Sequence, residues 1–194
     1  MGVVLTKGQK LSLTKDNPGL TKVVAGLGWD VNQFDTGQDA DLDVEVFMTG
    51  ADDKCTKDSD FVFFGQKVHP SGAVVHSGDN RTGEGEGDDE QVRIDLSKIP
   101  EEIQKLYFTV TIYDAEAKRQ NFGQIDNAYI RLVNEDTGEE LGRYDLGEEF
   151  SIETSMIFAQ LYRYNGEWKF AAVGSGYTGG LEALCDRFGI SFQK

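Results

Sequence analysis

Hydrophobic and polar residues alternate with a period of two along most of the chain. In the segment VRIDL, Val92, Ile94 and Leu96 would face one side of a strand, and the charged residues between them would face the other. The segment LYFTVTIY at 106–113 alternates apolar residues with tyrosines and threonines in the same way. This alternation is typical of strands in antiparallel sheets that have one face toward solvent.

Short segments rich in β-branched and aromatic residues predict strands, and glycine and aspartate clusters separate them. The predicted strands are 3–5, 11–13, 22–27, 42–49, 60–64, 73–76, 91–96, 106–113, 128–133, 141–146, 155–164 and 167–173. Asn165 and Gly166, between the last two segments, predict a tight hairpin turn. This pattern predicts an all-β fold, an antiparallel β-sandwich that forms a single domain over residues 1–194.

Helix signals are few. The segment KIPEEIQK at 98–105 has Pro100 near its first turn and predicts one short helix. The segment GGLEALCDRFG at 179–189 is amphipathic and ends at Gly189, which predicts a second short helix. We therefore expect one or two short helices beside the sheets.

The chain is strongly acidic, with 19 Lys and Arg against 34 Asp and Glu and a formal net charge of −15. Its field disfavours nucleic acids and anionic membrane surfaces and favours cations or basic partners. The start MGVVLTKGQKLSL lacks the apolar core of a signal peptide, and no apolar run has the length of a membrane span. We expect a cytoplasmic protein, for which any membrane association would come through a partner. Cys55 and Cys185 are then expected to be reduced thiols.

The segment GDNRTGEGEGDDE at 78–90 places six carboxylates and four glycines in thirteen positions. Two carboxylates about 5 Å apart repel by roughly 3 kcal/mol at an effective dielectric constant near 20, so an ion-free loop would be forced apart. A bound Ca²⁺ reverses the sign of this term, and glycines allow main-chain carbonyls to turn toward the ion. The segment is not an EF-hand, because Glu84 stands where that loop requires glycine.

A second acidic segment, GQDADLDVEV, places Asp39, Asp41 and Asp43 at alternate positions, so that an extended chain projects them from one face. Asp30 and Asp114 stand at other predicted strand ends. Oxygen ligands without clustered histidine or cysteine favour Ca²⁺ or Mg²⁺, and their large number favours Ca²⁺. The two acidic segments therefore predict an ion site at one end of the sandwich, and two ions would suit this many acids.

Six motifs, in order along nearly the whole chain, resemble the TerD family of tellurium-resistance proteins. They are GLGWD at 26–30, GQDADLD at 37–43, GDNRTGEGEGDDE at 78–90, TIYDA at 111–115, NAYIRLVN at 127–134 and GYTGGL at 176–181. The resemblance implies a C2-like β-sandwich that binds Ca²⁺ between loops at one end. It also implies a role in bacterial stress response and tellurite resistance, alongside other tellurium-resistance proteins that include an integral membrane protein.

The same motifs imply the ligands. The ligand candidates are Asp30, Asp41, Asp43, Asp79, Asn80, Gly83, Gly85, Asp88, Asp89 and Glu90. Asp39, Asp60 and Asp114 are weaker candidates. The segment ADDKCTKDSD departs from the family pattern, so the resemblance gives Cys55 no role.

The expected function is that of a soluble, non-enzymatic calcium-binding protein that acts as a Ca²⁺-dependent interaction module. No catalytic constellation is recognisable in the sequence. Two alternatives are open: a metal-dependent hydrolase of phosphoesters, because carboxylate clusters also serve metal-assisted hydrolysis, and an acidic module that binds a basic partner protein without metal.

Overall fold

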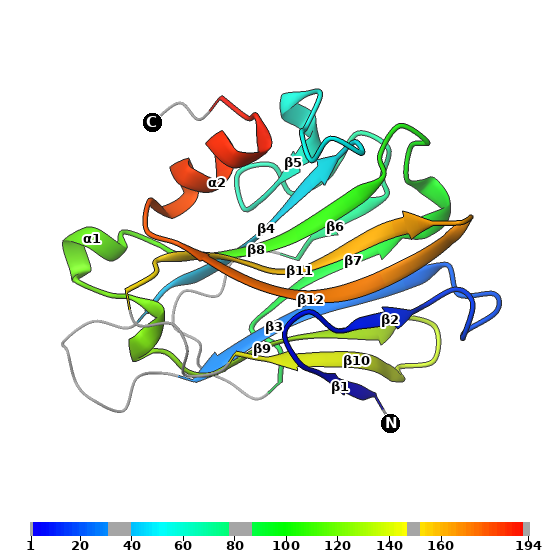
Figure 1. Cartoon of the computed structure of the whole chain (residues 1–194), viewed down its shortest axis with the longest axis horizontal. Coiled ribbons are helices and arrows are strands. Elements are labelled where there is room, and N and C mark those ends of the chain that lie inside the picture. Colours follow the sequence, from blue (N-terminus) through cyan, green and yellow to red (C-terminus); the bar gives the residue numbers. More distant parts are fainter. Residues whose placement is uncertain (1, 31–39, 78–86, 147–151, 192–194) are drawn as a thin grey trace.

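The computed structural model describes residues 2–30, 40–77, 87–146 and 152–191, and it contains two six-stranded sheets packed face to face (Figure 1). The first sheet holds, in spatial order, β1 (Val3–Leu5), β10 (Glu140–Asp145), β9 (Asp126–Asn134), β3 (Lys22–Asp30), β7 (Glu90–Asp95) and β6 (Val74–His76). The second sheet holds β2 (Lys10–Ser12), β12 (Glu167–Tyr177), β11 (Ser155–Tyr164), β8 (Lys105–Ile112), β4 (Leu42–Thr49) and β5 (Phe61–Val62). The predicted β-sandwich is confirmed.

The core lies between the sheets and follows the predicted alternation. On β7, Val92 and Ile94 are buried in the core, while Arg93 is exposed. On β8, Leu106 and Phe108 point into the same core from the second sheet. Among the described residues, the paired strands are antiparallel except that β1 pairs with β10 in parallel.

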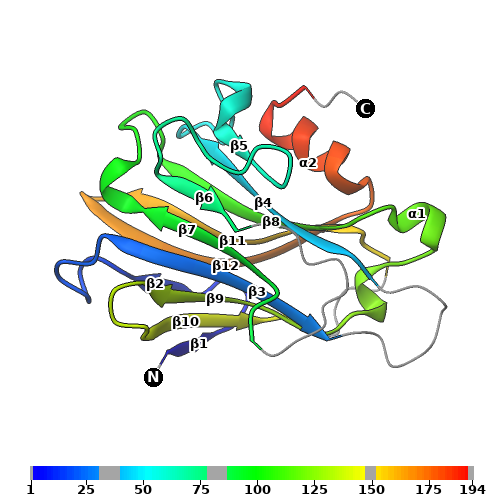
Figure 2. The same cartoon turned by 180° about the vertical axis from the view of Figure 1, so that it is seen from behind.

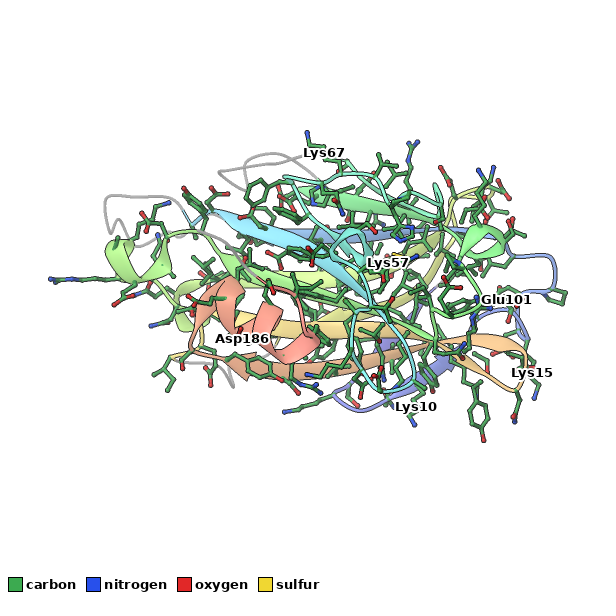
Figure 3. All side chains as sticks on the ribbon, turned by 90° about the horizontal axis from the view of Figure 1, so that it is seen from above. Lys10, Lys15, Lys57, Lys67, Glu101 and Asp186 are labelled. Atoms are coloured by element: carbon green, nitrogen blue, oxygen red, sulfur yellow. The ribbon has the colours of Figure 1, made fainter. Side chains whose placement is uncertain are left out.

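Part of the outer face of the second sheet is covered, whereas the alternation predicted a face open to solvent. Helix α2 (Gly180–Phe188) packs over it (Figure 3) and places the Phe188 ring 4.5 Å from Phe47 and 4.8 Å from Tyr107, between ring centroids. These side chains form a second apolar cluster with Leu184 and Ile157. The prediction was wrong here because β8 alternates between two buried environments, one between the sheets and one beneath the helix.

The predicted hairpin turn and one of the two predicted helices are present in the structure. Helix α2 ends at Gly189 in the left-handed conformation (φ 77°), as predicted. Asn165 and Gly166 both have positive φ, 50° and 76°, as a two-residue hairpin turn requires. No helix forms at 98–105. A 3₁₀ turn, η2 (Leu96–Lys98), precedes this segment and ends at Lys98. Ile99 is extended because it precedes Pro100, whose ring disfavours helical backbone in the preceding residue.

One end of the sandwich, called here the loop end, gathers the acidic motifs. Strand β3 finishes there at Asp30, β4 begins at Leu42, β7 begins at Glu90 and β9 begins at Asp126 (Figures 1 and 2). Three further short helical segments, η1 (Asp58–Asp60), α1 (Ala115–Lys118) and η3 (Phe122–Gln124), connect strands, and α1 lies at this end (Figure 1). In the described part of the chain, no helix has the length and apolar character needed to cross a membrane.

Candidate functional site

The structure places the predicted ligands in several different environments. Asp39, Asp79, Asn80, Gly83 and Gly85 lie outside the described residues. Asp30, Asp41, Asp43, Asp88, Asp89 and Glu90 lie at or near the ends of β3, β4 and β7 that meet at the loop end, whereas Asp60 precedes β5 near the other end of β4. Among the residues that the structure describes, no three Asp, Glu, His or Cys side chains converge into a group that could hold a metal ion.

Asp30 and Asp126 face each other across two adjacent strands. They are paired in the antiparallel register of β3 and β9, and both side chains are exposed. Like charges placed directly opposite on neighbouring strands are destabilising. The Asn127 side-chain amide, Nδ2, donates to Asp30 Oδ2. Asp126 was not among the predicted ligands, although it comes directly before the NAYIRLVN motif.

Asp89 lies next to this pair, just before β7. Its Oδ2 accepts a hydrogen bond from the Trp29 backbone N–H at 2.9 Å, and its own N–H donates to Leu27 O at 2.7 Å. Burial raises the pKa of the Asp89 carboxyl, the bond from Trp29 opposes that rise, and the charges of Asp88 and Asp30 add to it. The charge of Asp30 therefore disfavours the charged form of Asp89.

Asp88 points the other way, onto the outer face of the first sheet. Arg131 donates from Nε to Asp88 Oδ1 at 2.8 Å and from Nη2 to Oδ2 at 3.0 Å. The Tyr129 hydroxyl and the Gln91 amide donate to the same carboxylate, at 2.9 and 3.1 Å. Burial alone would raise the pKa of Asp88, but the bonds from Arg131, Gln91 and Tyr129 outweigh it and the pKa is lowered.

This arrangement depends on glycine in β3. A Cβ atom on Gly26 would overlap the Asp88 carboxylate, and one on Gly28 would overlap the Tyr129 ring. The outer face of the first sheet therefore has room for the Asp88–Arg131 pair only because both residues are glycine. The two glycines of the GLGWD motif supply this space.

Glu90 points inward and connects the two sheets. Its Oε2 accepts from the Val44 N–H at 2.8 Å and lies 3.5 Å from His76 Nε2, which itself donates to Val44 O at 3.0 Å. Both side chains are buried. Glu90 therefore holds the start of β7 against β4 across the core.

Asp43 is buried on the outer face of the second sheet, where its charge acts on Glu45. Glu45 is fully buried and accepts from the hydroxyls of Thr109 and Thr111 at 2.7 and 2.6 Å. Burial raises the pKa of Glu45 well above its usual range, and the charge of Asp43 adds to the rise. Half-buried Asp41 comes just before β4, and its backbone carbonyl accepts from the Tyr113 N–H at 2.7 Å.

The weaker candidates have other roles. Asp60 is buried and lies 2.9 Å from His69 Nε2, while its second oxygen accepts from the Thr56 hydroxyl. Asp114 has a left-handed backbone (φ 54°) and comes directly before α1. Burial raises the pKa of both cysteine thiols, Cys55 and Cys185, to about 12, so neither position favours a reactive thiolate.

Comparison with known proteins agrees with the motifs. The TerD domain profile matches residues 1–188. The chain is 58% identical to general stress protein 16U of Bacillus subtilis over 98% of both chains. It is 52% identical to the tellurium resistance protein TerD of Serratia marcescens, over 98% of this chain and 99% of that protein. A crystal structure of the protein SAV2460, of unknown function, has the same fold with a TM-score of 0.72 at 23% identity, over 90% of this chain and 99% of that one. The chain therefore belongs to the TerD family of tellurium-resistance and stress-response proteins.

Proposed function

We propose that this TerD-family protein is a calcium-binding module without catalytic activity, which binds Ca²⁺ at the loop end. The observation that carries the proposal is the pairing of Asp30 with Asp126 across β3 and β9, with Asp89 beside them. Like charges opposite each other on neighbouring strands repel, the charge of Asp30 also disfavours that of Asp89, and a bound cation would convert this repulsion into attraction.

The chemistry of the donors fits calcium. Carboxylate oxygens are hard ligands, and Ca²⁺ takes six to eight oxygens in flexible geometry. The described carboxylates supply part of such a shell. Its completion is assigned to the acidic segments outside the described residues, where Asp79, Asn80, Gly83 and Gly85 remain the expected ligands.

Asp88 and Glu90 would support this site without binding the ion. Arg131 engages both oxygens of Asp88, and Glu90 is buried between the sheets with Val44 and His76. Asp89 lies between these two anchored residues in the chain. Their opposite orientations, one outward and one inward, fix the backbone from which Asp89 projects.

The proposed role of the ion is to change the charge of the loop end and so to control docking. Binding two divalent cations would bring this end from strongly negative toward neutral, which would permit contact with a partner that the apo protein repels. The proposed partners are other tellurium-resistance proteins. They include an integral membrane protein, which this protein would contact at the cytoplasmic face of the membrane.

A calorimetric titration of chelator-stripped protein with Ca²⁺ tests the proposal. We expect saturable binding that weakens at least tenfold in Asp30→Asn/Asp126→Asn. The matched control is Asp16→Asn/Asp136→Asn, which removes the same charge from exposed positions in the turns at the opposite end of the sandwich, where Figure 3 shows the neighbouring Lys15. Equal weakening in both variants would mean that only net charge matters, and the absence of binding in the unmodified protein would refute the proposal.

A further inference from the structure

A cavity of about 830 Å³ opens between the outer face of the second sheet, the start of α2 and the turn that leads into α1. Its described lining comes from β4, β8, the residues after β5 and the first turn of α2. This volume lies within the range of small-molecule sites, which are apolar clefts with a few convergent polar groups. Of the described ligand candidates, Asp43 and Asp114 line it, whereas Asp30, Asp89 and the paired Asp126 of the proposed ion site are not among the described lining residues.

The charge in this cavity has one sign. Asp43, Asp114, Glu116 and Glu182 contribute to the lining, and no described lining residue is Lys, Arg or His. Asp43 is only 4% exposed, so its carboxylate lies in a less polar setting than the exposed acids of α1 and α2. Charge interactions strengthen in such a setting, because the effective dielectric constant is lower there than in bulk water.

The rest of the described lining combines aromatic and aliphatic side chains with threonines and glycines. Phe63, Phe64 and Tyr113 line the cavity, and the last two are partly exposed to solvent. Aromatic faces attract cations, and methylene groups pack well against them. The chain already uses one of these rings in this way, because Lys118 Nζ lies 5.7 Å from the centroid of the Tyr113 ring.

We propose that this cavity binds a small organic cation, an alkylammonium or alkylguanidinium group. Its charged head would lie toward Asp43, and its methylene stem would pack on Phe63 and Phe64. An inorganic divalent ion would leave the aromatic walls without a contact, whereas an organic cation uses both parts of the cavity. The group could belong to a free diamine or to a lysine or arginine side chain of a partner.

Titration of the calcium-saturated protein with two probes tests the proposal. The probes are 1,5-diaminopentane, which represents a free diamine, and acetyl-Gly-Arg-Gly-amide, which represents a side chain. Saturation with Ca²⁺ removes competition from the loop end, and a repeat in chelator shows whether binding depends on that site. Saturable binding of either probe, with chemical-shift changes at Tyr113 and Leu181, supports the proposal. The probe that binds more tightly shows whether the cation belongs to a free diamine or to a side chain of a partner.

Two variants show whether binding takes place in this cavity. We expect Glu116→Gln/Glu182→Gln and Tyr113→Leu each to weaken binding about tenfold. The double variant Asp16→Asn/Asp136→Asn removes two acidic charges far from the cavity and should leave binding unchanged. Failure of both probes to bind, equal weakening in the control, or equal binding of the uncharged analogue 1-pentanol would overturn the proposal.

Discussion

Arg131 binds both oxygens of the Asp88 carboxylate, at 2.8 and 3.0 Å, and this pair anchors the start of β7 to the outer face of β9. The Asp88 side chain is 1% exposed and that of Arg131 is 32% exposed. The acidic motif therefore contains one residue whose charge is neutralised by the protein itself. Asp88 positions the residues after it, and the pair is the support on which the proposed ion site depends.

Replacing Arg131 with methionine should destabilise the protein by about 2 kcal/mol. The substitution leaves Asp88 buried without its cationic partner, which costs 3–5 kcal/mol for a fully buried pair and less at a half-buried one. Chemical denaturation measures the change. Arg93→Met is the matched control, since Arg93 is 66% exposed and its contact with Glu135 is long, at 3.5 Å. We expect the control to change stability by less than about 0.5 kcal/mol, and equal losses in the two variants would show that Asp88 does not need Arg131.

Gly26→Ala should disrupt the same pair without changing any charge. The added methyl group would overlap the Asp88 carboxylate, which four hydrogen bonds hold in place. We expect a loss of about 1–3 kcal/mol in unfolding free energy, as for other overpacked sites. Gly50→Ala is the control, because a Cβ atom added there would lie 3.2 Å from the nearest atom, an oxygen of the exposed Asp52 side chain, and would not overlap it. If Gly26→Ala unfolds at the same denaturant concentration as the control, the tight packing around Asp88 is not required.

The sequence predicted the two-sheet fold well because the period-two alternation is strong and the Asn165–Gly166 turn is specific. It could not predict that β8 is buried on both faces, because residues such as Thr109 and Thr111 look solvent-exposed until α2 is placed over them. The acidic motif predicted where the acidic residues gather. It could not show that the side chains of Asp88, Asp89 and Glu90 point in three different directions, because the three residues look equivalent in the sequence. Asp88, Asp89 and Glu90 point to the outer face, the loop end and the core because only Glu90 belongs to β7 and the two residues before it depart from strand geometry. Their partners Arg131 and Val44 are distant in sequence.

Glu45 should make the protein less stable as the pH rises. Burial raises its pKa, so the folded state binds a proton that the unfolded state has lost above its usual pKa of about 4.3. The stabilising contribution is therefore complete below that value and is lost as the pH rises through the raised pKa, by about 1.4 kcal/mol for each unit. In Glu45→Gln this dependence should vanish, and the variant should gain stability relative to the unmodified protein between pH 5 and 8. A difference between the two proteins that stays constant over this range would contradict the assignment.

The two cysteines should be nearly inert in the folded protein. With the pKa of each thiol raised to about 12, chiefly by burial, the thiolate fraction at pH 8 is roughly a thousandfold below that of an ordinary cysteine. Iodoacetamide labelling followed by mass spectrometry should show rapid modification of Cys55 and Cys185 only after denaturation. Rapid labelling of Cys55 or Cys185 in the native state would contradict this prediction.

Thermal unfolding of chelator-stripped protein, alone and with about 1 mM Ca²⁺ or Mg²⁺, tests the central claim most directly. An ion at about 100 times its Kd adds roughly 2.7 kcal/mol for each site, which raises Tm by several degrees. The calcium-binding account predicts a rise that is larger with Ca²⁺ than with Mg²⁺ and that disappears in Asp30→Asn/Asp126→Asn. An unchanged Tm with both ions, in protein shown to be free of metal, would contradict the account and make the metal-independent acidic module the better explanation of the loop end.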